Sequence, residues 1–312
     1  MSHEIETIAY SGEEPWHGLG IKVPADLTPA QMQEAAGLNW TVDKVPLFGT
    51  HNGKKHGTGK SGLFRASDST LLDVVSDDWN VVQNDTAFEF FNDFVAAGDM
   101  EMHTAGSLKN GQIVWALAKI KESFEVVKDD VVDSYMLFTN PHKYGWATSV
   151  SFTGIRVVCM NTLRLSLGSA NSDKIVKVHH HQQFNSDDVK VLMGISHEKL
   201  QTYKEMAQFL ASKKAKKENV IEYFNRVFPM TSKNSQKETS RNATIAMDLL
   251  EKQPGAEFAA GTWWQPANSV TYMFDHLIGH NADNRLTNSW YGSGRKTKID
   301  AMKLAVEMAQ AA

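Results

Sequence analysis

Residues Ser134–Leu167 read SYMLFTNPHKYGWATSVSFTGIRVVCMNTLRLSL, and this stretch sets the expected fold. Its first apolar run, Tyr135–Phe138, has the length and aromatic content of a buried strand. Asn140–Gly145 is predicted to be a turn, because proline fixes φ and glycine permits a reversal. Trp146–Phe152 is then expected to return as the second strand of a hairpin. The chain is predicted to continue through Arg156–Arg164 into a short helix that ends near residue 168.

The same stretch contains a candidate functional block, formed by His142, Arg156, Cys159 and Asn161. An enzyme could use Cys159 as a nucleophile and His142 as its base, because a thiolate needs a base within hydrogen-bond reach. Arg156 and Arg164 would lie one turn from Cys159 if the segment were helical, which would favour the thiolate. The apolar neighbours of Cys159 favour the alternative that it is a core side chain.

Composition and length indicate a globular protein with a sizeable core. The chain has 312 residues, 42% of them hydrophobic, and a formal net charge of −4, which argues against a generic binder of polyanions. One cysteine excludes an internal disulfide framework and a zinc site built from cysteines. No apolar run approaches the ~20 residues that span a bilayer, and the N-terminus lacks the pattern of a signal peptide. We therefore expect a cytoplasmic protein without a membrane partner.

Charge is distributed unevenly along the chain. Residues 66–133 contain 14 acids and 4 bases, a balance of −10. Residues 199–241 contain 10 bases and 4 acids, a balance of +6. Such asymmetry indicates either a basic face for a polyanion or self-association through opposite faces, and a merely solvated helical surface is the alternative.

The first half of the chain has the pattern of antiparallel hairpins with one or two helices. Asn110–Gly111 is a strong hairpin signal between Met102–Ala105 and Gln112–Ile120, because both turn residues tolerate positive φ. Residues 1–37 are expected to be irregular, apart from a helix that starts at Pro29. The other expected elements are strands at Trp40–Phe48, Leu71–Val75, Trp79–Val82 and Lys174–Val178, a polar loop at Gly49–Gly62, and a helix from Asn84 to Gly98.

Two strings invite a ligand-binding interpretation that their surroundings do not support. Gly57–Ser61 reads GTGKS, but a phosphate-binding loop needs a further glycine where Lys54 stands and a helix after the motif. A basic loop that contacts phosphates non-specifically is the better prediction. The three histidines His179–His181 cannot all face one metal from a strand, and no local Asp, Glu or Cys joins them. We therefore expect neither a nucleotide site nor a metal site there.

From Ser186 the pattern becomes helical. A long amphipathic helix is predicted from Ser186 to Leu210, and the lysine-rich stretch Lys213–Lys217 follows it. Arg285–Lys298 is expected to be a loop that mixes basic and aromatic residues with glycines, a composition suited to stacking bases and holding phosphates. The alternative is that Trp290 and Tyr291 cover the core and the basic residues start a helix. Other predicted elements are helices at Val220–Val227, Thr239–Glu251, Pro266–Ile278 and Lys298–Gln310, and a polar linker at Thr231–Lys237. The fold class is therefore α+β, with a β-rich core at residues 1–183 and a mostly helical region at 184–312 packed on it.

Several ordered strings resemble the phage/plasmid-like protein family, which is catalogued as a domain of unknown function. The strings are PWHGLG from Pro15, WNVVQN from Trp79, TAGSLKNG from Thr104 with VWALA from Val114, RVVCMNTL from Arg156, and GTW from Gly261 with Asn268 and Asp275–His276. The resemblance covers nearly the whole chain and implies carriage on a mobile element and a bacterial cytoplasm. It brings no established reaction. The chain departs from the family's His-Asp-Gly turn, since it has His142-Lys143-Tyr144-Gly145, and so lacks the carboxylate of a catalytic His–Asp pair.

These observations favour a phage- or plasmid-encoded protein of DNA metabolism that binds and anneals single-stranded DNA without catalysis, cofactor or metal. The hairpin-plus-helix pattern loosely resembles the core of Rad52-type annealing proteins, which is an analogy at the level of fold. Homo-oligomers are expected, because annealing proteins assemble. The alternatives are a host-takeover or anti-defence protein that binds a host protein, and a Cys/His enzyme. The candidate phosphate contacts are Lys213, Lys214, Lys216, Lys217, Arg295 and Lys296, and the candidate stacking residues are Trp290 and Tyr291.

Overall fold

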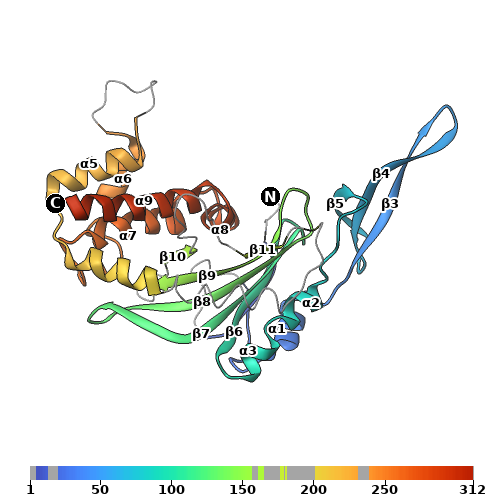
Figure 1. Ribbon diagram of the computed structural model, residues 1–312, viewed down its shortest axis with the longest axis horizontal. Helices are drawn as coiled ribbons and strands as arrows, with labels where there is room; N and C mark the ends of the chain where they lie inside the picture. Colours follow the sequence, from blue (N-terminus) through green and yellow to red (C-terminus); the bar gives the residue numbers. More distant parts are fainter. Residues whose placement is uncertain are drawn as a thin grey trace. The chain divides into compact units, whose positions relative to one another are not determined.

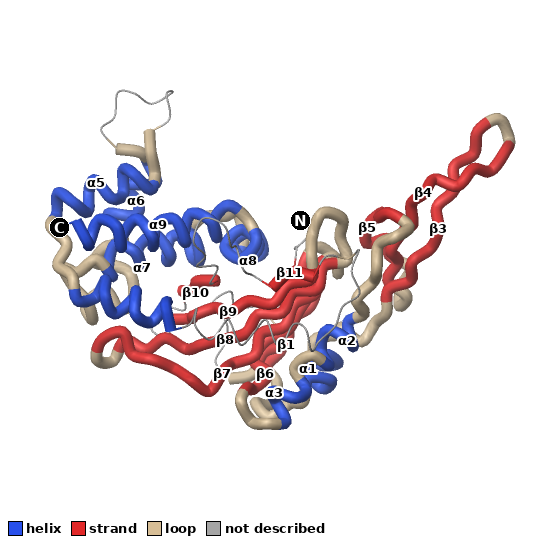
Figure 2. Tube along the Cα trace, in the orientation of Figure 1, coloured by secondary structure: helices blue, strands red, loops and turns tan. Residues whose placement is uncertain are grey.

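The computed structural model describes residues 5–12, 20–156, 161–164, 176–178, 180, 201–230 and 239–311 (Figure 1). Strands lie mostly in the N-terminal half and helices in the C-terminal region, so the expected α+β class with antiparallel sheets is confirmed (Figure 2). The expected domain boundary at 183/184 lies outside the described residues. Two compact units are formed, the first by Met1–Lys121, Tyr135–Ser151 and Lys174–Ile195, and the second by Glu122–Ser134, Phe152–Asp173 and Ser196–Ala312.

The larger sheet has eight strands in the order β10-β9-β8-β7-β6-β1-β2, and β11 pairs with β9. Its β6–β7 hairpin confirms the prediction from Asn110–Gly111, since Lys109, Asn110 and Gly111 all have positive φ. The strands are β1 (Ile5–Tyr10), β2 (Ile21–Lys22), β6 (Met100–Leu108), β7 (Ile113–Val127), β8 (Asp130–Pro141), β9 (Thr148–Arg156), β10 (Asn161–Arg164) and β11 (Val176–Val178).

Strand β1 corrects the expectation that residues 1–37 are irregular outside one helix. It pairs antiparallel with β6, with Tyr10 opposite Thr104. Gly106 permits a close approach of the two strands, because a Cβ at that position would meet the Thr7 carbonyl oxygen at 2.5 Å. The strand was missed because it is short and its partner lies about a hundred residues later in the chain.

The central block forms the predicted hairpin and then departs from the prediction. Strand β8, a turn with positive φ at Gly145, and strand β9 follow in the expected order. The helix expected after Arg156 is wrong for residues 161–164, which form β10 and pair with β9 so that Asn161 lies opposite Arg156. Backbone pairing with a neighbouring strand therefore overrides the local helical pattern.

The helices described in the first unit are α1 (Pro29–Ala35), α2 (Asn84–Glu89) and α3 (Asn92–Ala96). Helix α1 begins as predicted, because the Thr28 and Gln31 side chains form a capping box. The single helix expected from Asn84 to Gly98 is instead two short ones, interrupted at Phe90–Phe91, whose rings pack against Phe138 of β8. The strand expected at Trp79–Val82 is absent from this described segment.

A second sheet of three strands has the order β3-β4-β5. Its strands are β3 (Val42–His51), β4 (Lys54–Arg65) and β5 (Thr70–Ser76). The polar loop expected at Gly49–Gly62 is therefore wrong. Asn52 and Gly53 have φ values of 49° and 71°, so they form a tight turn that joins two long strands. The Asn-Gly signal is present in the sequence, but its flanks lack the apolar alternation of a half-buried strand.

The C-terminal region is helical, with residues 201–212 followed by α5 (Lys217–Val227), α6 (Arg241–Asp248), α7 (Trp264–Tyr272), the π-helical turn η2 (Met273–Leu277), α8 (Ala282–Tyr291) and α9 (Ser293–Ala311). Trp263, Trp264 and Tyr223 are fully buried there. The loop expected at Arg285–Lys298 is wrong, because α8 and α9 fill that range. No helix among the described residues is long and apolar enough to cross a membrane.

A buried ion pair lies within this helical region. The Lys298 ammonium donates to a carboxylate oxygen of Asp275 at 2.7 Å, and both side chains are 0% exposed. Ser289 donates to the same carboxylate and accepts from Lys298. Burial lowers the pKa of Lys298, while the charge and hydrogen bond of Asp275 oppose that shift. The π-helical turn is the element that carries Asp275.

Candidate nucleic-acid interface

The hairpin of β3 and β4 extends as a two-stranded ribbon beyond the last residues that pair with β5 (Figures 1 and 2). We call residues Asp43–Lys60 the arm; its two-stranded part is Leu47–Gly59, because the residues on either side pair within the three-stranded sheet. Every side chain of the arm is exposed except Leu47, which is half-buried. From Lys44 to Lys60 the sequence contains four lysines and no Asp or Glu. From Lys44 onward the arm is thus an exposed segment of one charge sign, although it belongs to an acidic chain.

The GTGKS string lies within the arm as part of a strand irregularity. Pro46 pairs with Ser61 and Phe48 with Gly57, so Leu47 alone opposes the three residues between Gly57 and Ser61. Gly59 adopts φ +65°, and the Thr58 hydroxyl donates to the Leu47 carbonyl oxygen at 2.7 Å. The string therefore forms a β-bulge and precedes no helix, as expected. It lacks the geometry that would hold a nucleotide phosphate.

Charged and aromatic side chains are sorted onto the two faces at the arm tip. Thr50 lies opposite Lys55, whose ammonium sits 3.8 Å from the centre of the Phe48 ring, and Phe48 is 53% exposed. His51 lies opposite Lys54 on the other face of the ribbon, since alternate residues point to opposite sides. One face thus combines a ring with a cation, and the other carries a histidine and a lysine.

The base of the arm is fixed to the rest of the first unit. The Lys44 ammonium donates to the backbone carbonyl oxygens of Asp77 and Trp79, at 2.9 and 3.0 Å. The Ser61 hydroxyl donates to the Asp77 carboxylate at 2.6 Å. Lys44 is therefore an anchor, and the lysines that face solvent are Lys54, Lys55 and Lys60.

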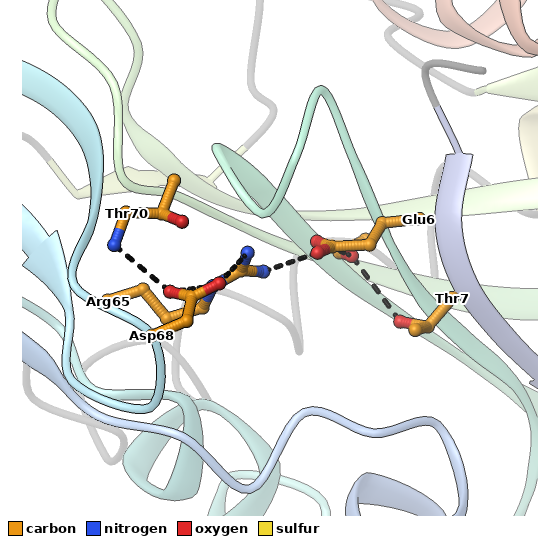
Figure 3. A network of polar contacts seen from close by, with 6 residues as sticks. Glu6, Thr7, Arg65, Asp68 and Thr70 are labelled. Carbon is orange, nitrogen blue, oxygen red and sulfur yellow. Dashed lines mark hydrogen bonds and ion pairs between the residues drawn. The ribbon is translucent and has the colours of Figure 1, made fainter. Parts of the chain in front are cut away.

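A polar network joins the end of β4 to the larger sheet (Figure 3). Arg65 donates two hydrogen bonds to Asp68, at 2.7 and 3.0 Å, and one to Glu6 of β1 at 2.6 Å. The Thr70 amide donates to Asp68 as well. The hydrogen bond with Arg65 lowers the pKa of Asp68, and that with Asp68 raises the pKa of Arg65. Arg65 is only 8% exposed, so this bidentate pair holds the arm's base rigidly.

The lysines predicted at 213–217 lie together on an exposed connection in the second unit. Lys213, Lys214, Lys216 and Lys217 are all exposed. Their backbone is held by a β-bridge between Lys214 and Thr262, and by the Trp263 amide, which donates to the Lys213 carbonyl oxygen. The structure thus groups these four cations on an ordered segment between residue 212 and α5.

The residues predicted near the C-terminus are placed less favourably for contact with a ligand. Trp290 is 3% exposed in α8, and Tyr291 is half-buried. Arg295 is half-buried and Lys296 exposed in the first turn of α9. A base could not stack on Trp290 without opening the core, which agrees with the alternative interpretation that this tryptophan covers the core.

Within the candidate central block, the structure describes the side chain of His142 alone. Cys159 and the side chains of Arg156 and Asn161 lie outside the described residues. His142 is fully buried, and its Nε2 lies 2.9 Å from Oδ1 of Asn84. The amide nitrogen of Asn84 already donates to two carbonyl oxygens, so its oxygen accepts and His142 is protonated on Nε2.

The opposite ring nitrogen of His142, Nδ1, has no hydrogen-bond partner among the described residues. Burial, reinforced by the charge of His180, lowers the pKa of His142 to about 3. A base with so low a pKa takes up a proton poorly at neutral pH. Its geometry is that of a core histidine hydrogen-bonded to α2.

Residues 71–297 match the profile of a family described as a domain of unknown function, DUF932. That range is more than half of the chain. The chain belongs to this family. No curated protein and no solved structure matches this chain. The family match contains Lys213–Lys217 and the residues 290–296, whereas the arm precedes it.

The sequence predicted phosphate contacts at Gly49–Gly62 but not the hairpin that presents these residues. The prediction identified the basic character of this segment but treated the segment as a loop. The available signal was the Asn52-Gly53 dipeptide, with no proline in Phe48–His51 before it or in Lys54–Gly57 after it. That signal, combined with the absence of acids from Lys44 to Lys60, predicts a basic hairpin.

Proposed function

We propose that this DUF932 protein binds nucleic acid, with the arm as its principal contact. The observation that carries the proposal is the exposed arm, which has Lys54, Lys55 and Lys60 and no acid from Lys44 to Lys60. A two-stranded ribbon fits the ~12 Å major groove of duplex DNA, and lysines along it neutralise phosphates. From Leu47 to His51 the two-stranded part is roughly 14 Å long at ~3.4 Å per residue, enough to follow several phosphates.

The finer proposal is a phage- or plasmid-encoded protein that binds and anneals single strands in the bacterial cytoplasm. Two basic surfaces support it, the arm and the lysine segment Lys213–Lys217, because annealing requires that two negatively charged strands be held at once. The exposed ring of Phe48 adds a stacking surface that every base can use. This activity needs charge neutralisation and stacking, and no bond is made or broken.

The test is a salt series of binding to labelled single- and double-stranded oligonucleotides. Each phosphate contact contributes about 0.7 to 0.9 to the slope of log affinity against log salt. Lys54→Gln with Lys55→Gln is therefore expected to flatten the slope by roughly 1.4 to 1.8. Lys22→Gln with Lys128→Gln removes two exposed lysines outside the arm and is the matched control. Absence of binding at ~50 mM salt, or equal slopes for both pairs, would sink the arm proposal.

The lysine segment is tested separately. Neutralising Lys213, Lys214, Lys216 and Lys217 together should also flatten the slope for single strands. Annealing of complementary oligonucleotides, monitored by fluorescence transfer, should be slower in the arm variant and in the lysine-segment variant if each surface holds one strand. Full annealing activity in the arm variant would restrict the arm to binding, and no annealing by the wild type would remove the finer proposal.

A further inference from the structure

The three-stranded sheet exposes apolar side chains that a solvated sheet face ordinarily lacks. The described residues include eight exposed large hydrophobic side chains, and four of them lie on β3 and β5. Val45 is 45%, Leu71 51% and Val74 39% exposed. One face of an antiparallel sheet can face water, but that face is then usually polar. Contiguous exposed apolar surface of this kind indicates an interaction site.

Strand register places these side chains on one face. Val45 pairs with Gly62, which pairs with Val74, and directly opposite residues project to the same side. Phe64 pairs with Leu71 and lies two residues from Gly62 along β4, so it shares that face. A Cβ on Gly62 would meet the Phe64 ring at 2.6 Å, which shows that the ring covers the glycine. We call Val45, Gly62, Phe64, Leu71 and Val74 the apolar face.

The opposite side of the same sheet is the side that packs into the unit. Val42, Leu63 and Val75 alternate with the residues of the apolar face and are 3%, 0% and 0% exposed. Both sides of this small sheet are therefore apolar, and only one has a cover within the described part of the chain. A sheet with two apolar sides is the pattern of a layer that packs between two others.

The two ends of the apolar face carry opposite charges. Asp43 pairs with Phe64 at the end near the body of the unit, and Lys60 pairs with Ser76 at the end near the arm tip. Both Asp43 and Lys60 are exposed. They are separated by the four residues from Phe64 to Lys60 along β4, roughly 13 Å at ~3.3 Å per residue. A surface with an acid at one end and a base at the other is complementary to itself when rotated by half a turn.

We propose that the apolar face is an interface for a second copy of this chain, packed face to face about a twofold axis that lies in the interface and runs across the strands. Asp43 of each copy then lies opposite Lys60 of the second copy, and the valines and leucine of both copies are covered. Such an isologous contact uses one patch twice and closes at a dimer. Lys54 and Lys55, whose substitution tests nucleic-acid binding, lie beyond the apolar face and stay uncovered, whereas Lys60 takes part in the dimer contact.

The test is the mass of the nuclease-treated protein in solution, measured by light scattering and sedimentation from about 1 to 200 µM. The wild type is expected to shift from monomer to dimer. Val74→Asp should raise the dissociation constant at least about tenfold, because it buries a charge without a partner. Ile221→Asp is the control, since Ile221 on α5 is 38% exposed and Val74 is 39% exposed. Equal urea midpoints of wild type and Val74→Asp will show that the monomer still folds.

Charge exchange distinguishes this contact from any other dimer. Asp43→Lys alone and Lys60→Asp alone each place like charges opposite one another and should weaken the dimer. The double variant restores opposite charges and should recover most of the wild-type affinity. A monomeric wild type at the highest concentration, a dimer indifferent to Val74→Asp, or a double variant weaker than both single ones would overturn the proposal.

Discussion

Acid should destabilise the first unit through one buried histidine, His142. In the unfolded chain a histidine has a pKa of about 6.5, whereas in the folded unit burial lowers the pKa of His142 to about 3. Between these two values the unfolded state binds a proton that the folded state excludes, so stability is lost as pH falls. The loss begins near pH 6.5 and continues to about pH 3.

The magnitude follows from linkage. At pH 5 protonation stabilises the unfolded state by RT ln(1 + 10^1.5), about 2 kcal/mol, and at pH 7 by only about 0.2 kcal/mol. His142 should therefore remove about 2 kcal/mol of unfolding free energy between pH 7 and pH 5. This result changes little if the folded pKa lies one unit higher, because that value is still well below pH 5.

The assay is urea unfolding at pH 7 and pH 5, and hydrogen exchange in peptides from β8 and α2 reports where the structure opens. His142→Gln keeps an N–H group for Asn84 and does not titrate. The unfolding free energy of this variant should therefore fall between pH 7 and pH 5 by about 2 kcal/mol less than that of the wild type. His51→Gln, which alters an exposed histidine, is the control and should behave as the wild type. Equal losses in wild type and His142→Gln would refute the argument.

Substitutions at the Asp275–Lys298 ion pair, at the Arg65–Asp68 pair and at Gly106 have defined outcomes. Asp275→Asn should lower the unfolding free energy in urea by about 3–5 kcal/mol, because it leaves the Lys298 ammonium buried without a counter-charge. Asp275→Leu combined with Lys298→Met should lower it much less. Equal losses would show that packing, and not the charge, determines the contribution of these side chains. Arg65→Gln should cost about 2 kcal/mol and speed hydrogen exchange in β4. Since the pKa of Asp68 is lowered, its contribution is present above about pH 4 and lost as pH falls through the lowered value, and Asp68→Asn should flatten that loss. Gly106→Ala should cost about 1–3 kcal/mol by forcing β1 from β6, which increased exchange in β1 would reveal.

Local signals predicted the elements whose stabilising groups are adjacent in sequence. The capping box of Thr28 and Gln31 needs no distant residue, and the Asn110–Gly111 turn fixes β6 against β7. Elements that depend on distant partners were not predictable in the same way. Strand β1 is stabilised by β6, and residues 161–164 are held extended by β9. The β6 partner of β1 lies far outside a window of ten or twenty residues, whereas β9 is close to residues 161–164 in sequence and only the return of the chain onto it was not signalled.

The residues of the candidate site also differ in whether their environment depends on local sequence or on distant contacts. The four lysines between 213 and 217 are exposed, as their composition indicates, but the burial of Trp290 depends on packing that its neighbours in sequence do not specify. The strands of the arm were not predictable for a different reason. Its strands have no buried face, so they lack the alternation by which strands are recognised, and only the turn Asn52–Gly53 marks them.

The long sequence separation between β1 and β6 has a consequence for synthesis on the ribosome. Tyr10 pairs with Thr104, and at ~5 to 20 residues per second the intervening chain takes roughly 5 to 20 s to emerge. During that interval Ile5–Tyr10 has only the two-residue strand β2 to pair with, whereas in the finished sheet it lies between β2 and β6. The nascent chain thus carries β1 without its β6 partner after the basic hairpin of β3 and β4 has been synthesised, so the hairpin can form before the larger sheet does.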